Sequence, residues 1–271
     1  GASYPTAVDA RRQLAAILVD QGHLREAEAA YRDSRAWLVA RVGPMHASVA
    51  KDDNSLGIIA WERGDPAAAL RWLDQSIAIR RAGVAGSSPL DLAGVLFNKA
   101  MILHDGGNDA PARPLLAEAL RLRATRLGAD HPLVGDTQRL LGEVDAALGD
   151  KARARGELQS AVDLTRNGYG EAHPHARRAQ LSLAAFDAAA GDPAALHRLD
   201  QLAQLPQADS ELRKVAWLAA GEAAALRCHG PQRAQALSSL ESVAQRARIA
   251  QPEGGVIPRR LARASAACGA T

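Results

Sequence analysis

The sequence is poor in aromatic residues, which make up 3% of its 271 positions. Alanine, leucine and arginine are abundant instead. These residues favour helices, and runs of β-branched residues, which favour strands, are few. Because 47% of the residues are hydrophobic, a chain of this length can bury a large apolar core. The composition therefore predicts an all-α protein and argues against a strand-rich one.

Cysteine is equally scarce, since Cys228 and Cys268 are the only two. Two cysteines this far apart are too few for a disulfide framework or a zinc site. They could pair if the end of the chain folds back as a helix on the helix pair before it, and pairing would favour an oxidising compartment. Otherwise each stays a separate thiol. The sequence leaves the compartment open, either cytoplasmic or, for the sensor of a membrane-anchored protein, periplasmic.

Long apolar runs and an excess of one charge are also missing. No stretch reaches about 18 uninterrupted apolar residues, so we expect no direct membrane insertion of this chain. The 33 basic and 30 acidic residues are interspersed, which argues against a nucleic-acid partner. The first residues, Gly1-Ala2-Ser3, lack a methionine. We interpret residues 1–4 as a cloning remnant or linker, and expect the chain to be part of a longer protein.

Signatures of catalysis are missing as well. The sequence contains no phosphate-binding Gly-x-x-x-x-Gly-Lys loop, no Gly-x-Ser-x-Gly elbow and no His-Glu-x-x-His helix. His131, His173 and His175 have no cysteine or carboxylate at a spacing that would complete a metal site. We therefore expect no enzyme, no metal and no other cofactor.

What the sequence does contain is an internal repeat. A glycine followed by a polar residue recurs at intervals of 42 or 43 residues, at Gly22-His23, Gly64-Asp65, Gly107-Asn108, Gly149-Asp150 and Gly191-Asp192. A second mark recurs in step with it, at Met45-His46-Ala47, Ser87-Ser88-Pro89, Asp130-His131-Pro132 and Ala172-His173-Pro174. Two marks with one period indicate a stack of similar structural units.

Each period holds two helices, because apolar residues between the marks recur three and four positions apart. Glycine ends the first helix, and proline suits the start of the next repeat's first helix. The predicted first helices are 5–21, 47–63, 89–105, 132–148 and 174–190, and the second helices are 24–41, 66–82, 109–126, 151–167 and 193–204. A divergent sixth pair spans 209–228 and 231–249, and a further helix spans 258–267. The predicted solenoid therefore covers residues 5–249, with repeats at 5–41, 47–82, 89–126, 132–167, 174–204 and 209–249, and residues 250–271 form a terminal helix or cap.

Small residues recur where paired helices cross. Seven positions before each punctuation glycine the chain has Ala15, Gly57, Ala100, Gly142 and Ala184, and five positions after it Ala27, Ala69, Ala112 and Ala154, with Leu196 as the exception. Helix backbones approach closely only where side chains are this small. We expect larger residues to fill the space between pairs, among them Leu14, Leu56, Leu141 and Leu183.

These columns resemble the tetratricopeptide repeat. The longer period and the segments Leu127–Pro132 and Tyr169–Pro174 resemble the kinesin-light-chain variety, whose repeats carry Leu-Gly-x-x-His-Pro, and Val49–Leu56 matches its first helix. The resemblance implies a right-handed superhelical solenoid of antiparallel helix pairs, with about five to six repeats of about 42 residues. It also implies a protein-binding scaffold. The arginine and alanine content is similar to that of bacterial proteins, in which such arrays often form sensory parts of signalling proteins, and we expect attachment to a serine/threonine kinase.

A stack of this kind binds partners on the side lined by its first helices. We expect a protein or peptide to bind there, because mixed apolar and hydrogen-bonding side chains suit an extended peptide or a helix. The candidate partner-binding residues on this side are Arg12, Lys51, Asn54, Ile58, Trp61, Phe97, Met101, His104, Arg139, Glu143 and Arg178.

Alternatives remain open at this stage. Trp61 and Phe97 could simply pack between neighbouring pairs. Arg139 and Arg178 could anchor an acidic segment, or be solvated or paired with Asp136 and Glu143. The chain could instead sense a small molecule or oligopeptide in an enclosed pocket, or associate with itself through the terminal helix.

Overall fold

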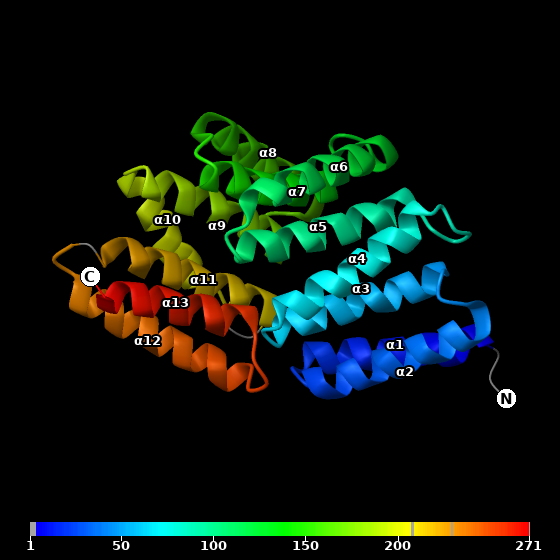
Figure 1. The fold of residues 1–271 in the computed structure, drawn as a ribbon. Coiled ribbons are helices and arrows are strands. Elements are labelled where there is room, and N and C mark those ends of the chain that lie inside the picture. The colour runs from blue at the N-terminus through cyan, green and yellow to red at the C-terminus, as the bar shows by residue number, and fades with distance from the viewer. Residues whose placement is uncertain (1–3, 207–208, 229, 271) are drawn as a thin grey trace. The chain divides into compact units, whose positions relative to one another are not determined.

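The computed structural model describes residues 4–206, 209–228 and 230–270, and within these residues it contains thirteen α-helices and no strand (Figure 1). The all-α prediction is confirmed. The first helices of the pairs are α1 (Tyr4–Asp20), α3 (Ala47–Glu62), α5 (Pro89–Asp105), α7 (Pro132–Ala147), α9 (Pro174–Ala189) and α11 (Ser210–Arg227). The second helices are α2 (Leu24–Val42), α4 (Pro66–Arg81), α6 (Asp109–Leu127), α8 (Lys151–Tyr169), α10 (Pro193–Ala203) and α12 (Arg233–Ala250). Of the expected remnant, residues 1–3 lie outside the described residues, and residue 4 begins α1.

The repeat marks are helix caps. At the start of the second helices α4, α8 and α10, the side chains of Asp65, Asp150 and Asp192 accept hydrogen bonds from backbone N–H groups of the first turn. At the start of the first helices α7 and α9, the imidazoles of His131 and His173 accept from the N–H two positions on, at 3.1 and 3.2 Å. Such bonds satisfy donors that the helix itself leaves unpaired. The recurring His-Pro pair therefore has a structural role in this fold.

The punctuation glycine ends the first helix in a conformation that other residues rarely adopt. At Gly64, φ is +87°. This lets its N–H reach the carbonyl of Trp61 while the next N–H, of Asp65, reaches Ala60. A left-handed residue at this place closes the helix and turns the chain toward its partner helix.

Small residues bring the paired helices together, as the repeat columns predict. A methyl group placed on Gly57 would lie 2.8 Å from Cγ of Leu73, and one on Gly142 would lie 2.8 Å from Cγ of Leu158. The alanines in the second small column, Ala27, Ala69, Ala112 and Ala154, are fully buried. The crossings of α3 with α4 and of α7 with α8 are therefore too close for a side chain on the glycine.

Larger residues fill the space between pairs, with one correction. Leu56 and its neighbour Ile59 are 1% exposed and pack against α1 and α2. Leu14, expected to do the same, is 56% exposed, and Ile17 at the place of Ile59 is 51% exposed. The prediction for Leu14 is wrong because, within the described part of the chain, no helix pair precedes α1 to cover it.

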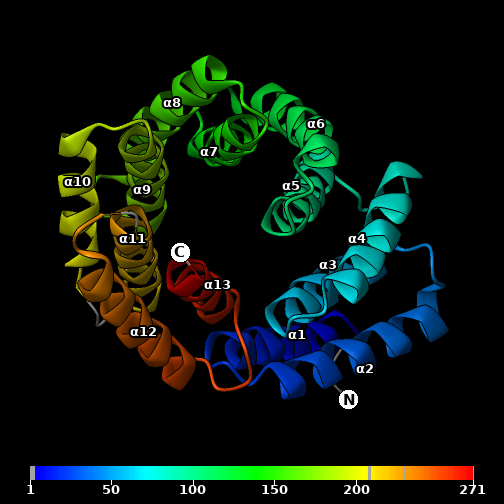
Figure 2. The same ribbon diagram turned by 60° about the vertical axis from the view of Figure 1, so that its left-hand side comes forward.

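The chain forms two compact units. Unit 1 comprises residues 1–122 and 251–256, and unit 2 comprises residues 123–250 and 257–271. In unit 1, α3 packs against α2 and α4 and also touches α5. In unit 2, α7, α9 and α11 lie side by side, and α8, α10 and α12 cover their other side (Figure 2). A single solenoid over residues 5–249 stays a prediction.

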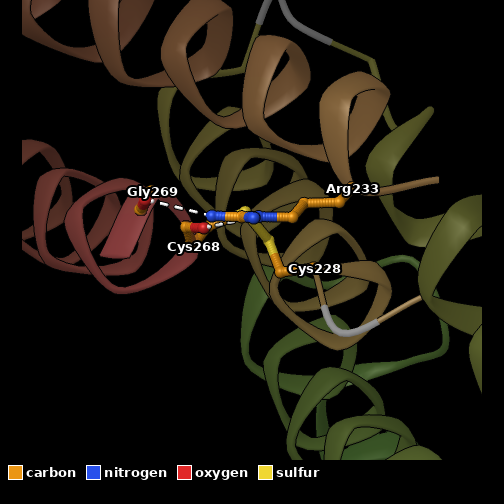
Figure 3. Close-up of a disulfide and its surroundings, with 4 residues drawn as sticks. All are labelled: Cys228, Arg233, Cys268 and Gly269. Atoms are coloured by element: carbon orange, nitrogen blue, oxygen red, sulfur yellow. Dashed lines mark hydrogen bonds between the residues drawn. A yellow bond between two sulfur atoms is a disulfide. The ribbon is translucent and has the colours of Figure 1, made fainter. Parts of the chain in front are cut away.

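The last helix, α13 (Val256–Ala270), belongs to unit 2 from Ile257 onward and is longer than the predicted 258–267. Its residues Ile257 and Leu261 pack against Trp217 of α11, and this apolar contact buries them within their own unit. Cys228 and Cys268 form a disulfide that ties the end of α13 to the end of α11 (Figure 3). The helix therefore packs against α11 of the last pair.

An arginine completes the end of α13. The guanidinium of Arg233, at the start of α12, donates to the carbonyls of Cys268 and Gly269 at 3.2 and 3.0 Å (Figure 3). The last carbonyls of a helix lack partners within the helix, and they carry its negative dipole end. A cation from α12 thus stabilises the same helix end that the disulfide holds.

Candidate functional site

The predicted apolar part of the binding surface lies on α3 and α5 of unit 1. Lys51 on α3 is exposed, while Asn54 and Ile58 on the same helix are partly buried. The amide nitrogen of Asn98 donates to the side-chain oxygen of Asn54 at 2.9 Å, which links α3 to α5. Asn98 was not among the predicted residues because it follows Phe97 directly, and the repeat positions predict Phe97 to line the binding side. Part of the hydrogen-bonding capacity of Asn54 is thus used within the fold.

The aromatic and sulfur side chains of this surface divide between core and solvent. Trp61 is 7% exposed and belongs to the apolar core of unit 1, and its indole N–H donates to Asp105 at 3.3 Å. Met101 packs on the same core. Phe97 keeps part of its ring accessible. The imidazole of His104 lies 2.5 Å from the carboxylate of Asp109. The packing interpretation of Trp61 therefore fits the structure.

Arg12 is held by the fold. Its guanidinium donates to Asp52 of α3 at 2.6 Å and to the carbonyl of Ser48 at 2.6 Å, and its side chain is 10% exposed. Asp52 is fully buried, and it also accepts from the hydroxyl of Ser34. Burial raises the pKa of Asp52, and the hydrogen bond and charge of Arg12 oppose that rise. This ion pair joins α1 and α2 to α3.

In unit 2 the structure brings two predicted residues into contact. Arg139 donates to Glu143 one turn along α7, at 2.6 Å. The hydroxyl of Ser182 on α9 donates to the same carboxylate. Glu143 therefore joins α7 to α9, and the pairing of Arg139 with Glu143 matches one of the alternatives that the sequence leaves open.

Arg178 on α9 has a different environment. Burial, together with the neighbouring charges of Arg139 and Arg260, lowers the pKa of its guanidinium to about 10, although Glu143 and Glu211 oppose the fall. Part of the residue still reaches solvent. Within the described residues its guanidinium forms no hydrogen bond or ion pair with another side chain. It is a partly buried cation whose side-chain donors have no hydrogen-bond partner among the side chains of the described residues.

Sequence reasoning missed the residues that α11 and α13 bring to this place. The charge of Arg260 on α13 lowers the pKa of Arg178. Burial raises the pKa of Glu222 on α11, and the charge of Arg260 opposes that rise. The sixth pair lacks the repeat marks, so the sequence does not show which residues of α11 face the binding side. The sequence predicts α13 only as a terminal helix or cap. We call Arg139, Arg178 and Arg260, with Glu143, Glu211 and Glu222, the charged cluster of unit 2.

Across residues 4–206, 209–228 and 230–270, no three His, Cys, Asp or Glu side chains come together as metal ligands. No helix in these ranges is long and apolar enough to cross a membrane.

Comparisons with known proteins agree with this architecture. No curated protein matches the sequence. Among solved structures, a putative kinesin light chain from Podosopora anserina with nearly identical repeats is 20% identical, covers 79% of this chain and 97% of its own, and superposes with a TM-score of 0.60. A Rap protein complexed with Competence and Sporulation Factor is 15% identical, with 96% of this chain and 75% of its own covered and a TM-score of 0.63.

A second Rap protein, the conjugation gene regulator of plasmid pLS20 in complex with the Phr* peptide, is 13% identical, with coverage of 96% and 74% and a TM-score of 0.62. At these identities the likeness concerns the fold. The sequence itself matches the tetratricopeptide repeat model over residues 5–82 and 91–167, which is more than half of the chain. With its repeat period, capped helix pairs and small-residue crossings, the chain belongs to the tetratricopeptide repeat family.

Proposed function

We propose that this protein is a non-catalytic binding module for an acidic peptide segment of a partner protein, and that Arg178 of the charged cluster anchors it. The single observation that carries the proposal is the partly buried guanidinium of Arg178, which has no side-chain hydrogen-bond partner among the described residues and feels the charges of Arg139 and Arg260. A partly buried cation without a hydrogen-bonding acceptor is costly to the extent that it loses water without gaining hydrogen bonds. A carboxylate from a ligand would supply the missing acceptor.

The chemistry of the Arg178 guanidinium favours a carboxylate as its ligand. A guanidinium presents its donors in a planar fork that matches a carboxylate, and such charged hydrogen bonds are stronger than neutral ones. Arg139 is already occupied by Glu143. The arrangement thus leaves Arg178 as the anchor, with Arg139 and Arg260 adding positive charge around it.

The remaining predicted residues lie in unit 1. Lys51, Ile58 and Phe97 keep accessible surface on α3 and α5 and offer one cation and two apolar groups. Such a mixture suits a peptide that binds unit 1 by itself. The Rap protein bound to the Phr* peptide supports a peptide as the ligand class, since its fold is similar.

The wider context is also a proposal. We infer that the module is a sensory or scaffolding part of a bacterial signalling protein, with a serine/threonine kinase as the attached domain. This inference rests on the resemblance of the repeats and on the composition, and it adds nothing to the argument for Arg178.

A peptide library selected on the immobilised protein tests the proposal. We expect the selected sequences to be enriched in Asp and Glu at one position, because one open guanidinium selects one carboxylate. The Arg178→Gln variant should lose this enrichment. Arg166→Gln, which removes an exposed arginine from α8, should keep it. Selection without acidic enrichment, or enrichment that survives Arg178→Gln, would move the ligand away from the charged cluster.

A further inference from the structure

Two histidines at the start of α9 use the same ring nitrogen in opposite ways. Nδ1 of His173 accepts from the backbone N–H of residue 175 at 3.2 Å and so caps the helix. Nδ1 of His175 lies 2.9 Å from both side-chain oxygens of Asp136 on α7. A carboxylate only accepts hydrogen bonds, so this nitrogen carries the proton. In the neutral rings, the proton therefore lies on Nε2 of His173 and on Nδ1 of His175.

Neighbours from other helices surround these two rings. The ring of Tyr169, at the end of α8, stacks on His173 with centroids 4.6 Å apart, and its hydroxyl donates to Asp136 at 3.2 Å. Burial, followed by the charge of Asp136 and the hydrogen bond to it, raises the pKa of Tyr169 to about 12. The phenol thus stays an uncharged donor. Arg123 of α6 adds a positive charge that attracts Asp136.

The sequence explains why an imidazole caps this helix. Pro174 has no N–H, so the N–H of residue 175 is the first helical donor that needs a partner. His173 supplies the acceptor that a side-chain oxygen supplies at most helix starts. Two further charges at this helix start pair with each other, since Glu171 in the preceding turn accepts from Arg177 of α9 at 3.2 Å.

Protonation affects the two histidines differently. Imidazole takes up a second proton between about pH 8 and pH 5, and the resulting imidazolium has two donors and no acceptor. His175 keeps its bond to Asp136, because Nδ1 is a donor in both forms. His173 loses its cap, because the proton occupies the lone pair that accepts the N–H. The new charge also lies at the positive end of the helix dipole, with the ring of His175 centred 5.3 Å away.

We propose that the start of α9 is a proton-operated switch and that His173 is its sensing residue. With His173 neutral, the first turn of α9 is capped. With His173 charged, this turn loses its cap and frays, while Asp136 still holds His175 and Tyr169. The carboxylate joins α7, α8 and α9 in both states, so the change is confined to the first turn. The switch concerns the helix start alone and does not depend on a ligand at Arg178.

Exchange of single backbone N–H groups with water, measured by NMR on the full chain near pH 8 and near pH 5, tests the switch. Relative to an unstructured peptide at the same pH, protection at residue 175 should fall about fivefold on acidification, the effect of losing an ordinary cap. The N–H of Ala194 at the start of α10 is the internal control, since it donates to Asp192 at 2.9 Å. This bond is the main cause that lowers the pKa of Asp192, so the carboxylate stays charged and protection at Ala194 should not change.

Two variants assign the response to one histidine. His173→Asn keeps a side-chain acceptor that does not titrate, so protection at residue 175 should be the same at both pH values. His175→Gln removes the other imidazole and keeps the cap, so the fall on acidification should remain. Circular dichroism at both pH values checks that the variants keep their helices.

Three results would overturn the proposal. One is equal protection of residue 175 at both pH values in the unaltered protein. Another is an equal fall at Ala194, which would indicate general loosening in acid. The third is a fall that persists in His173→Asn or is lost in His175→Gln, because the response would then come from another group.

Discussion

Asp145 and Glu157 share one guanidinium: Arg153 lies 3.2 Å from Oδ2 of Asp145 and 3.4 Å from Oε1 of Glu157. Asp145 is fully buried, and the Glu157 side chain is 18% exposed. Burial, followed by the charge of Asp145, raises the pKa of Glu157 from its ordinary 4.5 to about 7, although Arg153 opposes the rise. Between pH 4.5 and about 7, the folded protein therefore keeps Glu157 protonated where the unfolded chain has released this proton.

This relationship predicts a pH-dependent stability. Between pH 4.5 and about 7 the folded state binds more protons at Glu157 than the unfolded state, so the free energy of unfolding falls as the pH rises through this window. The stabilising contribution of protonated Glu157 is fully present below pH 4.5 and is lost above about pH 7. Its size is on the order of 3 kcal/mol. Urea unfolding of unaltered protein and Glu157→Gln measures it.

The amide variant mimics the protonated acid. We expect Glu157→Gln to match the unaltered protein near pH 4 and to exceed its unfolding free energy near pH 8. Glu241→Gln, which alters an exposed acid on α12, should show no such trend. A stability difference between Glu157→Gln and unaltered protein that is constant from pH 4 to pH 8 would contradict the assignment.

Two leucines at the same repeat position should differ in their effect on stability. Leu56→Ala removes a buried side chain and leaves a cavity, which costs about 2–5 kcal/mol of unfolding free energy. Leu14→Ala alters a residue that is 56% exposed and should cost less than about 1 kcal/mol. Equal losses in chemical denaturation would mean that α1 is covered by further structure.

Two glycines of one helix pair should respond oppositely to alanine. At Gly142 the added methyl would lie 2.8 Å from Leu158 and 3.0 Å from the backbone oxygen of Ala154, and we expect a loss of about 1–3 kcal/mol. Gly156 in α8 has open space around it. There alanine should stabilise the helix by about 0.5–1 kcal/mol. Thermal and urea unfolding of the two variants should give changes of opposite sign, and a stable Gly142→Ala protein would contradict the close crossing.

Reduction of the disulfide should loosen unit 2. The bond closes a loop with a sequence separation of 40, for which chain entropy gives a stabilisation of up to about 4 kcal/mol. Urea unfolding should therefore shift to lower concentration when a phosphine reductant is added. The double variant Cys228→Ser, Cys268→Ser should be insensitive to the reductant. An unchanged midpoint for the unaltered protein would show that α13 does not need the bond.

The helices could be predicted from the sequence because their limits depend on nearby residues. Glycine at the end and aspartate or His-Pro at the start determine the caps locally, and the observed ends fall within about two residues of the prediction for α1 to α12. Small-residue columns likewise predicted the crossings. Leu14 was the failure, because its burial depends on a neighbour outside its own repeat.

The candidate sites were predictable only in part. Arg139, Glu143 and Arg178 lie on first helices, ten, six and thirteen residues before the punctuation glycines, and each of these positions is expected to face the same side of the stack. Arg260 comes from the terminal helix, and Glu253 comes from the segment before it. No local pattern indicates that Glu253 accepts from the backbone N–H of Arg25 at the start of α2, because that contact depends on how distant segments fold against each other.

The central claim is that Arg178 anchors an acidic residue of a peptide. Isothermal titration of the best peptide from the library selection against unaltered protein and Arg178→Gln tests it most directly. A hydrogen bond between charged groups contributes about 1.5–3 kcal/mol, so the variant should bind roughly 10- to 150-fold more weakly. Replacing the peptide's acidic residue by its amide should give a similar loss, and the two losses should not add. Equal affinity of both proteins for the acidic peptide would contradict the account.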